Sequence, residues 1–103
     1  MNFIFEVHIK PGYSAEQYAK AWIRASELIQ KAPGAQGTRL HRKIGNDSIL
    51  LAIATWESKQ ARDAIDHNAD KRIAEIIQAE AEFVEIVLIG EFDAPEWEVL
   101  PDG

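Results

Sequence analysis

Residues 37–61 read GTRLHRKIGNDSILLAIATWESKQA and predict two strands, a tight turn and the start of a helix. Residues 37–44 and the largely apolar residues 48–55 favour extended chain, because β-branched and apolar side chains suit a sheet. Gly45-Asn46-Asp47 between them is typical of a hairpin turn. Ser58 follows the strand predicted at residues 48–55 and can cap a helix. The stretch therefore predicts an antiparallel hairpin that leads into a helix.

A strand and a helix are also predicted before this stretch. Residues 3–10 alternate in side-chain type, which indicates a strand with two faces. Ser14 and Gln17 have the spacing of a capping box, which predicts a helix from Ala15. Pro33-Gly34 ends that helix. Its predicted apolar stripe consists of Tyr18, Trp22, Ala25 and Ile29.

A second helix and a fourth strand follow the hairpin. The helix is expected to break at Asp66-His67-Asn68, and residues 82–92 predict the strand. The helix stripe consists of Ala61, Ile65, Ala69, Ile73, Ile76 and Ile77. The order β-α-β-β-α-β predicts an α+β, ferredoxin-like fold, a four-stranded antiparallel sheet with two helices on one face. With 103 residues we expect one domain over 1–103, with its core in 3–92 and a tail in 93–103.

The composition argues against several classes of partner and chemistry. A net charge of -6 disfavours nucleic acid and anionic membranes, since both attract excess Lys and Arg. The absence of cysteine excludes disulfides, thiolate nucleophiles and Cys-based metal sites. No apolar run reaches the ~20 residues of a membrane span, and the first residues lack the pattern of a secretory signal. We therefore expect a cytoplasmic protein that takes a small-molecule ligand.

The third and fourth predicted strands are apolar on both faces. Such strands are usually covered on both sides, whereas two helices cover only one face of this sheet. Monomers rarely leave a large apolar face bare, so the sequence predicts a homodimer packed sheet to sheet. On the third strand Ile49, Leu51 and Ile53 alternate with Leu50, Ala52 and Ala54, and on the fourth strand Phe83, Val87 and Ile89 alternate with Val84, Ile86 and Leu88.

Charge is unevenly distributed between the second strand and the C-terminal third. Residues 39–43 hold Arg39, His41, Arg42 and Lys43, and this fold places their strand at a sheet edge. Residues 73–103 contain nine acidic residues and no Lys or Arg. We expect the acidic tail to lie on the basic edge of a partner chain, with Trp97 as its apolar anchor. The alternative is a tail that frays in solvent.

Three segments carry a resemblance to a known family. Residues 5–12 (FEVHIKPG), 33–40 (PGAQGTRL) and 53–61 (IATWESKQA) are similar to the small antibiotic-biosynthesis-monooxygenase-like proteins of the dimeric α/β-barrel superfamily. The resemblance implies a dimeric α/β barrel. It also implies one of three outcomes: oxidation of anthrone-like or hydroquinone polyketides by oxygen without a cofactor, haem degradation, or no known reaction. The haem-degrading pattern is missing, since Val7, Ile65 and Glu75 stand where it has Asn, Trp and His.

A cofactor-free oxygenase needs a base that titrates near working pH, which favours histidine. His67 is the candidate base, with Asn68 as amide donor and Arg72 as cation for the resulting anion. The alternative is a helix break capped by Asn68 with His67 in solvent. His8 and Glu6 share one face of the first strand, where they line a cavity or form a structural pair.

The aromatic residues offer a site for a planar substrate. Trp22, Trp56, Tyr13 and Tyr18 could line a pocket between helices and sheet, and core packing is the competing interpretation. Arg24 could reach its rim, and His41 is expected in solvent. The spacing of the three histidines disfavours a metal site.

The sequence therefore predicts a cofactor-independent monooxygenase for a small aromatic or polyketide-like phenol. The alternative is a non-catalytic dimeric barrel that binds a small apolar ligand, and a third hypothesis is an isomerase or decarboxylase in the same cleft.

Overall fold

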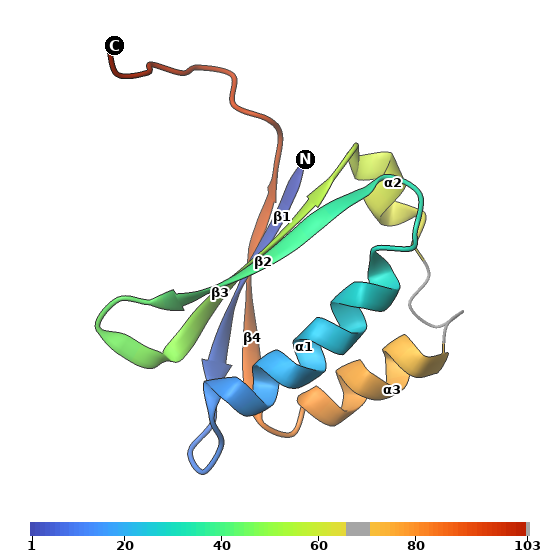
Figure 1. Cartoon of the computed structure of the whole chain (residues 1–103), viewed down its shortest axis with the longest axis vertical. Helices are drawn as coiled ribbons and strands as arrows, with labels where there is room; N and C mark the ends of the chain where they lie inside the picture. Colours follow the sequence, from blue (N-terminus) through green and yellow to red (C-terminus); the bar gives the residue numbers. More distant parts are fainter. Residues whose placement is uncertain (66–70, 103) are drawn as a thin grey trace.

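A computed structural model describes residues 1–65 and 71–102, which form a four-stranded antiparallel sheet with helices on one face (Figure 1). The elements in chain order are β1 (Asn2–Ile9), α1 (Ala15–Ile29), β2 (Ala35–Lys43), β3 (Asn46–Trp56), α2 (Lys59–Asp63), α3 (Lys71–Glu80) and β4 (Val84–Phe92). The strand order is β2-β3-β1-β4, so β2 and β4 form the two edges. The predicted ferredoxin-like α+β fold is confirmed.

Helix α1 begins where the capping box predicts. The Gln17 amide N–H donates to Ser14 Oγ at 3.2 Å, and the Ser14 N–H donates to Gln17 Oε1 at 2.7 Å. These bonds satisfy amide groups that the helix itself leaves without acceptors. Tyr18 and Ala25 are buried, as expected of the stripe that faces the sheet.

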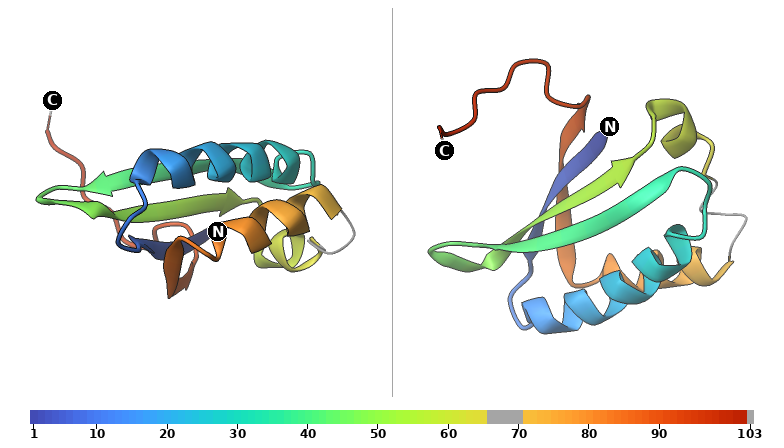
Figure 2. Two further views of the ribbon diagram at one scale, coloured as in Figure 1. Left: turned by 90° about the horizontal axis from the view of Figure 1, so that it is seen from below. Right: turned by 45° about the horizontal axis from the view of Figure 1, so that its top comes forward.

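The second predicted helix is present as two helices. Ser58 caps α2 by accepting the Ala61 N–H at 3.1 Å, and α2 ends at Asp63. Helix α3 lies beside α1 (Figure 2). The predicted break at residues 66–68 lies outside the described residues.

The two faces of the sheet have different surroundings. Val7 pairs with Leu50 of β3 and Ile86 of β4, and Val7 and Leu50 are buried against Ala15 and Tyr18 of α1. Alternate residues point to the opposite face, where no described helix covers them. The helices therefore bury one face. The second face, here called the open face, carries a set of aliphatic residues: Ile4, Ile49, Leu51, Ile53 and Val87.

The strand ends differ slightly from the prediction. The hairpin turn is Ile44-Gly45 rather than Gly45-Asn46-Asp47, because Lys43 pairs directly with Asn46. Strand β4 starts at Val84 rather than at residue 82, because the chain turns after α3, where the Phe83 N–H donates to the Glu80 carbonyl at 3.1 Å.

A bulge in β4 directs one acidic residue toward α2. The β1–β4 register shifts between Ile4 and Phe5, so that Glu91 pairs with Phe3 on the helix-covered face. There Glu91 binds Lys59 of α2 at 2.9 Å. The bulge therefore ties the start of α2 to the edge strand.

The tail after β4 leads away from the sheet (Figure 2). Residues 93–102 form neither helix nor strand, and Trp97 is 85% exposed. Within the described residues, no helix has the length and apolar character needed to cross a membrane.

Candidate active site

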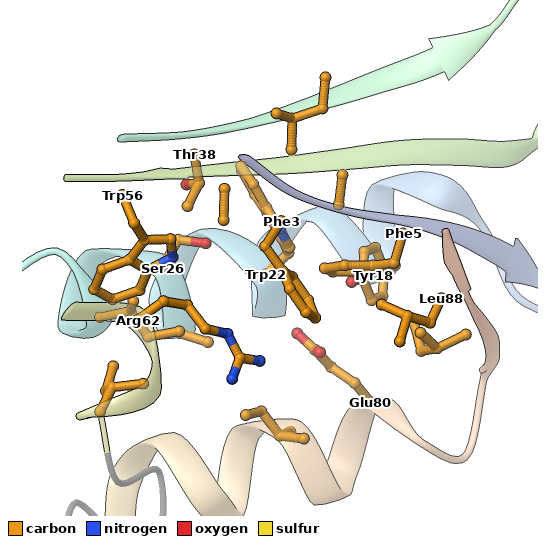
Figure 3. Close-up of a pocket in the computed structure, with 18 residues that line it drawn as sticks. Phe3, Phe5, Tyr18, Trp22, Ser26, Thr38, Trp56, Arg62, Glu80 and Leu88 are labelled. Carbon is orange, nitrogen blue, oxygen red and sulfur yellow. The ribbon is translucent and has the colours of Figure 1, made fainter. Parts of the chain in front are cut away.

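A pocket of about 390 Å³ lies between the helices and the covered face of the sheet (Figure 3). Its volume falls in the range of roughly 300–1,000 Å³ that small-molecule sites occupy. All four strands line one side of it, β2 through Thr38 alone among the described residues, and α1, α2 and α3 line the other. The fold therefore leaves space where a fully packed core would have none.

Aromatic rings form much of the pocket wall. They are Phe3 and Phe5 of β1, Tyr18 and Trp22 of α1, and Trp56 of β3. Phe3 and Phe5 meet edge to face, with centroids 5.9 Å apart and an interplanar angle of 61°. Rings in such arrangements offer both faces and edges to a planar guest.

Two charged side chains line the pocket among the described residues, and they come from different helices. Arg62 of α2 lies over the Phe3 ring, with its Cζ 4.3 Å from the ring centroid. Glu80 is the last residue of α3 and is only 8% exposed. Figure 3 shows the Glu80 carboxyl and the Arg62 guanidinium extending into the same space. No ion pair joins the two side chains in this part of the structure.

Glu80 has an unusual environment for a carboxyl. Its Oε1 atom is buried and has no hydrogen-bond partner among the described residues. Burial disfavours the charged form and raises the pKa of Glu80 to about 7, while Arg24 on α1 lowers it to a smaller extent. A carboxyl of this kind exchanges protons near neutral pH.

Tyr18 is the hydroxyl-bearing neighbour of this carboxyl. Burial, with a smaller contribution from the Glu80 carboxylate, raises the pKa of Tyr18 above its ordinary value. Tyr18 therefore keeps its proton at neutral pH and can act only as a neutral hydroxyl in the pocket.

The pocket opens between α3 and the edge strand β4. Ile77 of α3 and Ile86 and Leu88 of β4 line it and yet are exposed, Leu88 to 62%. Apolar side chains that are partly exposed at an opening suit the entry of an apolar ligand.

The structure brings three of the predicted site residues together. Tyr18, Trp22 and Trp56 line the pocket. His67 and Asn68 lie outside the described residues, and Arg72 is an exposed residue in the first turn of α3. Tyr13 stacks on Phe83 at 5.3 Å and is not part of the pocket lining.

Glu6 and His8 lie on the opposite face of the sheet from this pocket. Glu6 Oε1 and His8 Nε2 are 3.0 Å apart, and both side chains are partly exposed. His41 lies on the same face, on edge strand β2 and opposite Leu51. Glu6 and His41 line a separate hollow of about 250 Å³. The structure therefore separates these polar residues from the aromatic pocket.

Glu80 and Arg62 line the pocket but were not predicted from the sequence. Glu80 follows Ile73 by seven residues and Ile77 by three, which is the spacing of the α3 apolar stripe. Continuing the stripe one position past Ile77 would have placed an acid on a buried face. Arg62 follows Ala61 of the α2 stripe, and nothing in the sequence indicates that it lies over Phe3.

Within the described residues, no three His, Cys, Asp or Glu side chains are grouped so that they could hold a metal ion. Among the described residues, the charged groups that line the pocket are one carboxyl and one guanidinium.

Several solved structures of other proteins share this fold. The chain is similar to SnoaB, a cofactor-independent oxygenase from Streptomyces nogalater, with a TM-score of 0.71 and 20% identity over 98% of this chain and 96% of that one. A conserved protein from Methanosarcina mazei has a TM-score of 0.68 and 17% identity, over 88% of this chain and 91% of that one. A conserved protein of unknown function from Bacteroides thetaiotaomicron has a TM-score of 0.69 and 15% identity, over 84% and 89% of the two chains.

At these identities the structures show a shared fold. No curated protein matches the sequence. The family model described as antibiotic biosynthesis monooxygenase matches residues 2–78, which is most of the chain and includes β1 through most of α3. The chain therefore belongs to the antibiotic biosynthesis monooxygenase family.

Proposed function

We propose that the protein is a cofactor-independent monooxygenase that oxidises a small, planar aromatic or polyketide-like phenol in the pocket between the helices and the sheet. The observation that carries the proposal is an aromatic-lined pocket of about 390 Å³ whose wall holds a buried carboxyl, one oxygen of which has no hydrogen-bond partner among the described residues. Family membership and the fold shared with SnoaB, which is described as a cofactor-independent oxygenase, support it.

The chemistry has defined requirements that the pocket meets. A base takes a proton from an acidic C–H or O–H, and the electron pair stays on the substrate as a carbanion or phenolate. That anion gives one electron to O₂, and the organic radical and superoxide join to form a peroxide anion. Return of the proton and loss of water leave a carbonyl group, so that a ring methylene changes as CH₂ + O₂ → C=O + H₂O. Apolar walls exclude water from the reactive anion.

His67, with Asn68 and Arg72, remains the sequence-based proposal for the base and its helpers. Glu6 and His8 remain proposed ligand contacts only for a molecule bound on the open face of the sheet, because the aromatic pocket is on the other side. No cofactor is part of the proposed reaction.

We also propose that the working unit is a homodimer packed sheet to sheet. Members of this family are commonly dimeric. The open face carries aliphatic residues on three adjacent strands. Ile53 of β3 pairs with Ile4 of β1, and Leu51 of β3 and Val87 of β4 lie on either side of Glu6 of β1. In the proposed dimer, the exposed Trp97 and the acidic residues of the tail contact the exposed basic residues of β2 in the partner chain. Charge complementarity and exposed apolar surface both favour this contact.

A second candidate function is binding without catalysis. The observation that favours it is the small polar content of the pocket, whose described lining has two charged residues. A pocket of this composition can hold an apolar ligand without changing it. An isomerase or decarboxylase in the same pocket is a third candidate, because proton abstraction alone requires similar groups.

The test is oxygen consumption by the purified protein with anthrone and 1,4-naphthalenediol, without added flavin, haem or metal. Uptake above that of boiled protein supports the oxygenase. Trp22→Leu should reduce uptake at low substrate by roughly tenfold, because it removes a pocket ring, whereas Ile23→Ala, on the outer side of the same helix, should not.

Two other results would each favour a different candidate. Product formed equally under nitrogen would identify an isomerase or decarboxylase. Saturable quenching of tryptophan fluorescence without any turnover would identify a binding protein and contradict the oxygenase.

A further inference from the structure

We propose that Glu80 is the proton acceptor of this pocket and that it selects aromatic ligands whose acidic hydroxyl or activated methylene group lies against its carboxyl. The inference rests on the proposed function, because it names the base of the same site. It stands on the position and the missing partner of one side chain, and on the groups that surround it.

The Oε1 atom of Glu80 is buried and lacks a hydrogen-bond partner among the described residues. Buried polar atoms in folded proteins nearly always have a hydrogen-bond partner, and exceptions call for an explanation. Glu80 Oε1 has none among the described residues, although only 8% of the residue is exposed. A ligand in the pocket that donates a hydrogen bond would supply the missing partner.

The surroundings of Glu80 limit the kind of ligand that can donate to it. Glu80 faces Tyr18 and Arg24 on α1 and shares the pocket with Arg62 of α2. The strand residues described in the lining carry no charge. Two guanidinium groups near the carboxyl disfavour a cationic ligand, and the rings of the wall favour a flat apolar one. A neutral aromatic molecule with an acidic hydrogen meets both conditions.

The protonation state of Glu80 suits a base. A base works best when its pKa lies near the operating pH, and Glu80 titrates near 7 because of its burial. At neutral pH a substantial fraction of the chains holds a carboxylate ready to accept a proton. Tyr18, whose pKa is raised, does not compete for this role.

Glu80 accepts the substrate proton in the first step and returns it in the last. The substrate O–H or C–H bond breaks, the proton goes to a Glu80 carboxylate oxygen, and the electron pair remains on the substrate. The guanidinium of Arg62 faces the same space and stabilises the anion. After O₂ has accepted the electrons as described above, the Glu80 carboxylic acid returns its proton to the peroxide anion.

A binding experiment tests the selection without requiring turnover. The probes are 2-naphthol and 2-methoxynaphthalene, which have the same ring system and differ in the hydrogen that can be donated. At pH 8 the wild type should bind 2-naphthol about tenfold more tightly, the order expected of a hydrogen bond to a charged acceptor. Glu80→Met, of similar length but without an acceptor, should bind the two probes alike.

The matched control is Glu75→Met, which changes an exposed glutamate of the same helix. It should keep the preference for 2-naphthol. An undiminished preference in Glu80→Met would overturn the assignment.

A kinetic experiment tests the base. With a substrate that the wild type oxidises, Glu80→Gln should lower kcat by about 10²–10⁴-fold and remove the rise of kcat around pH 7. Full activity in Glu80→Gln together with loss of activity in His67→Ala would overturn Glu80 and leave the oxygenase standing. Absence of oxygen uptake by the wild type would contradict the proposed function, and the naphthol pair would still decide on Glu80.

Discussion

The Arg62 guanidinium lies over the Phe3 ring, with its Cζ 4.3 Å from the ring centroid. A cation at this distance from an aromatic face gains roughly 0.5–2 kcal/mol. The contact joins α2 to β1 and keeps a positive charge in a wall that consists mostly of aromatic and aliphatic side chains and also holds Glu80. The Arg62 Nη1 atom also lies 3.9 Å from Asp63 Oδ1.

Replacement of Arg62 by Met should make a bound phenol harder to ionise. A nearby cation stabilises a phenolate, so its removal should raise the apparent pKa of bound 2-naphthol by about one unit. The measurement is a pH titration of naphtholate absorbance in the presence of excess protein. Lys59→Met removes another cation from the same helix, one that binds Asp63 and Glu91 outside the pocket, and should leave that pKa unchanged. Equal shifts in both variants would contradict a specific role for Arg62.

Replacement of Glu80 by Gln should stabilise the protein above neutral pH. In the folded chain the pKa of Glu80 is about 7, against an ordinary value of 4.5. Below about pH 4.5 the carboxyl is protonated in both the folded and the unfolded state. Between 4.5 and 7 the unfolded chain loses its proton first, so the free energy of unfolding of the wild type falls as the pH rises.

The gain from Glu80→Gln should therefore be small at pH 4, increase up to pH 7 and then stay constant, at most about 3 kcal/mol. Urea unfolding at pH 4, 6 and 8 measures it. Glu75→Gln is the control on the same helix and should show little pH-dependent gain. A Glu80→Gln variant that loses stability at pH 8 would show that the carboxylate has a stabilising partner.

The order of elements and the first helix cap could be predicted because they depend on local patterns. The Ser14–Gln17 capping box needs only two side chains at a fixed spacing. Alternation in β1 separates Val7 from Glu6 and His8, but it does not say which face the helices cover, and the structure decides it through the contact of Val7 with α1.

The candidate site was predicted less completely because it depends on contacts between distant segments. Tyr18 and Trp22 could be found, since they belong to an apolar stripe. Glu80 and Arg62 enter the pocket only through the placement of α2 and α3 against the sheet, and a single charged residue in a helix is usually in solvent. The β4 bulge that turns Glu91 toward Lys59 likewise has no distinct signal apart from Gly90, whose φ is +148°.

Replacement of Gly34 by Ala should destabilise the fold more than replacement of Gly12. Both glycines have positive φ, +86° and +89°, so an alanine at either position costs roughly 1–2 kcal/mol of backbone energy. At Gly34 an added Cβ would also lie 2.6 Å from the Cβ of Ala61, whereas at Gly12 it meets nothing within 4 Å. The overlap should add roughly 1–3 kcal/mol.

Chemical denaturation of Gly34→Ala and Gly12→Ala measures the difference. Ala61 precedes Arg62, so a displaced α2 should also shift the ionisation of bound 2-naphthol. Adding Ala61→Gly to Gly34→Ala should recover the overlap energy, less about 1 kcal/mol for a glycine in a helix. Equal destabilisation by the two single variants would mean that α2 moves aside without cost.

Replacement of Leu51 by Glu should dissociate the proposed homodimer. Leu51 lies on the open face, opposite Glu6 of β1 and His41 of β2, so a carboxylate there would be buried beside the like charge of Glu6 in the assembly. Sedimentation equilibrium should show a dimer for the wild type, and a dissociation constant for Leu51→Glu that is raised by at least 100-fold. Ile23→Glu, on the exposed outer side of α1, is the control and should remain dimeric.

Deletion of residues 94–103 should weaken the dimer less, because it removes Trp97 and acidic residues but leaves the sheet face intact. A monomeric wild type at micromolar concentration would contradict the sheet-to-sheet assembly, and an unchanged dissociation constant after the deletion would contradict the contact between the tail and β2.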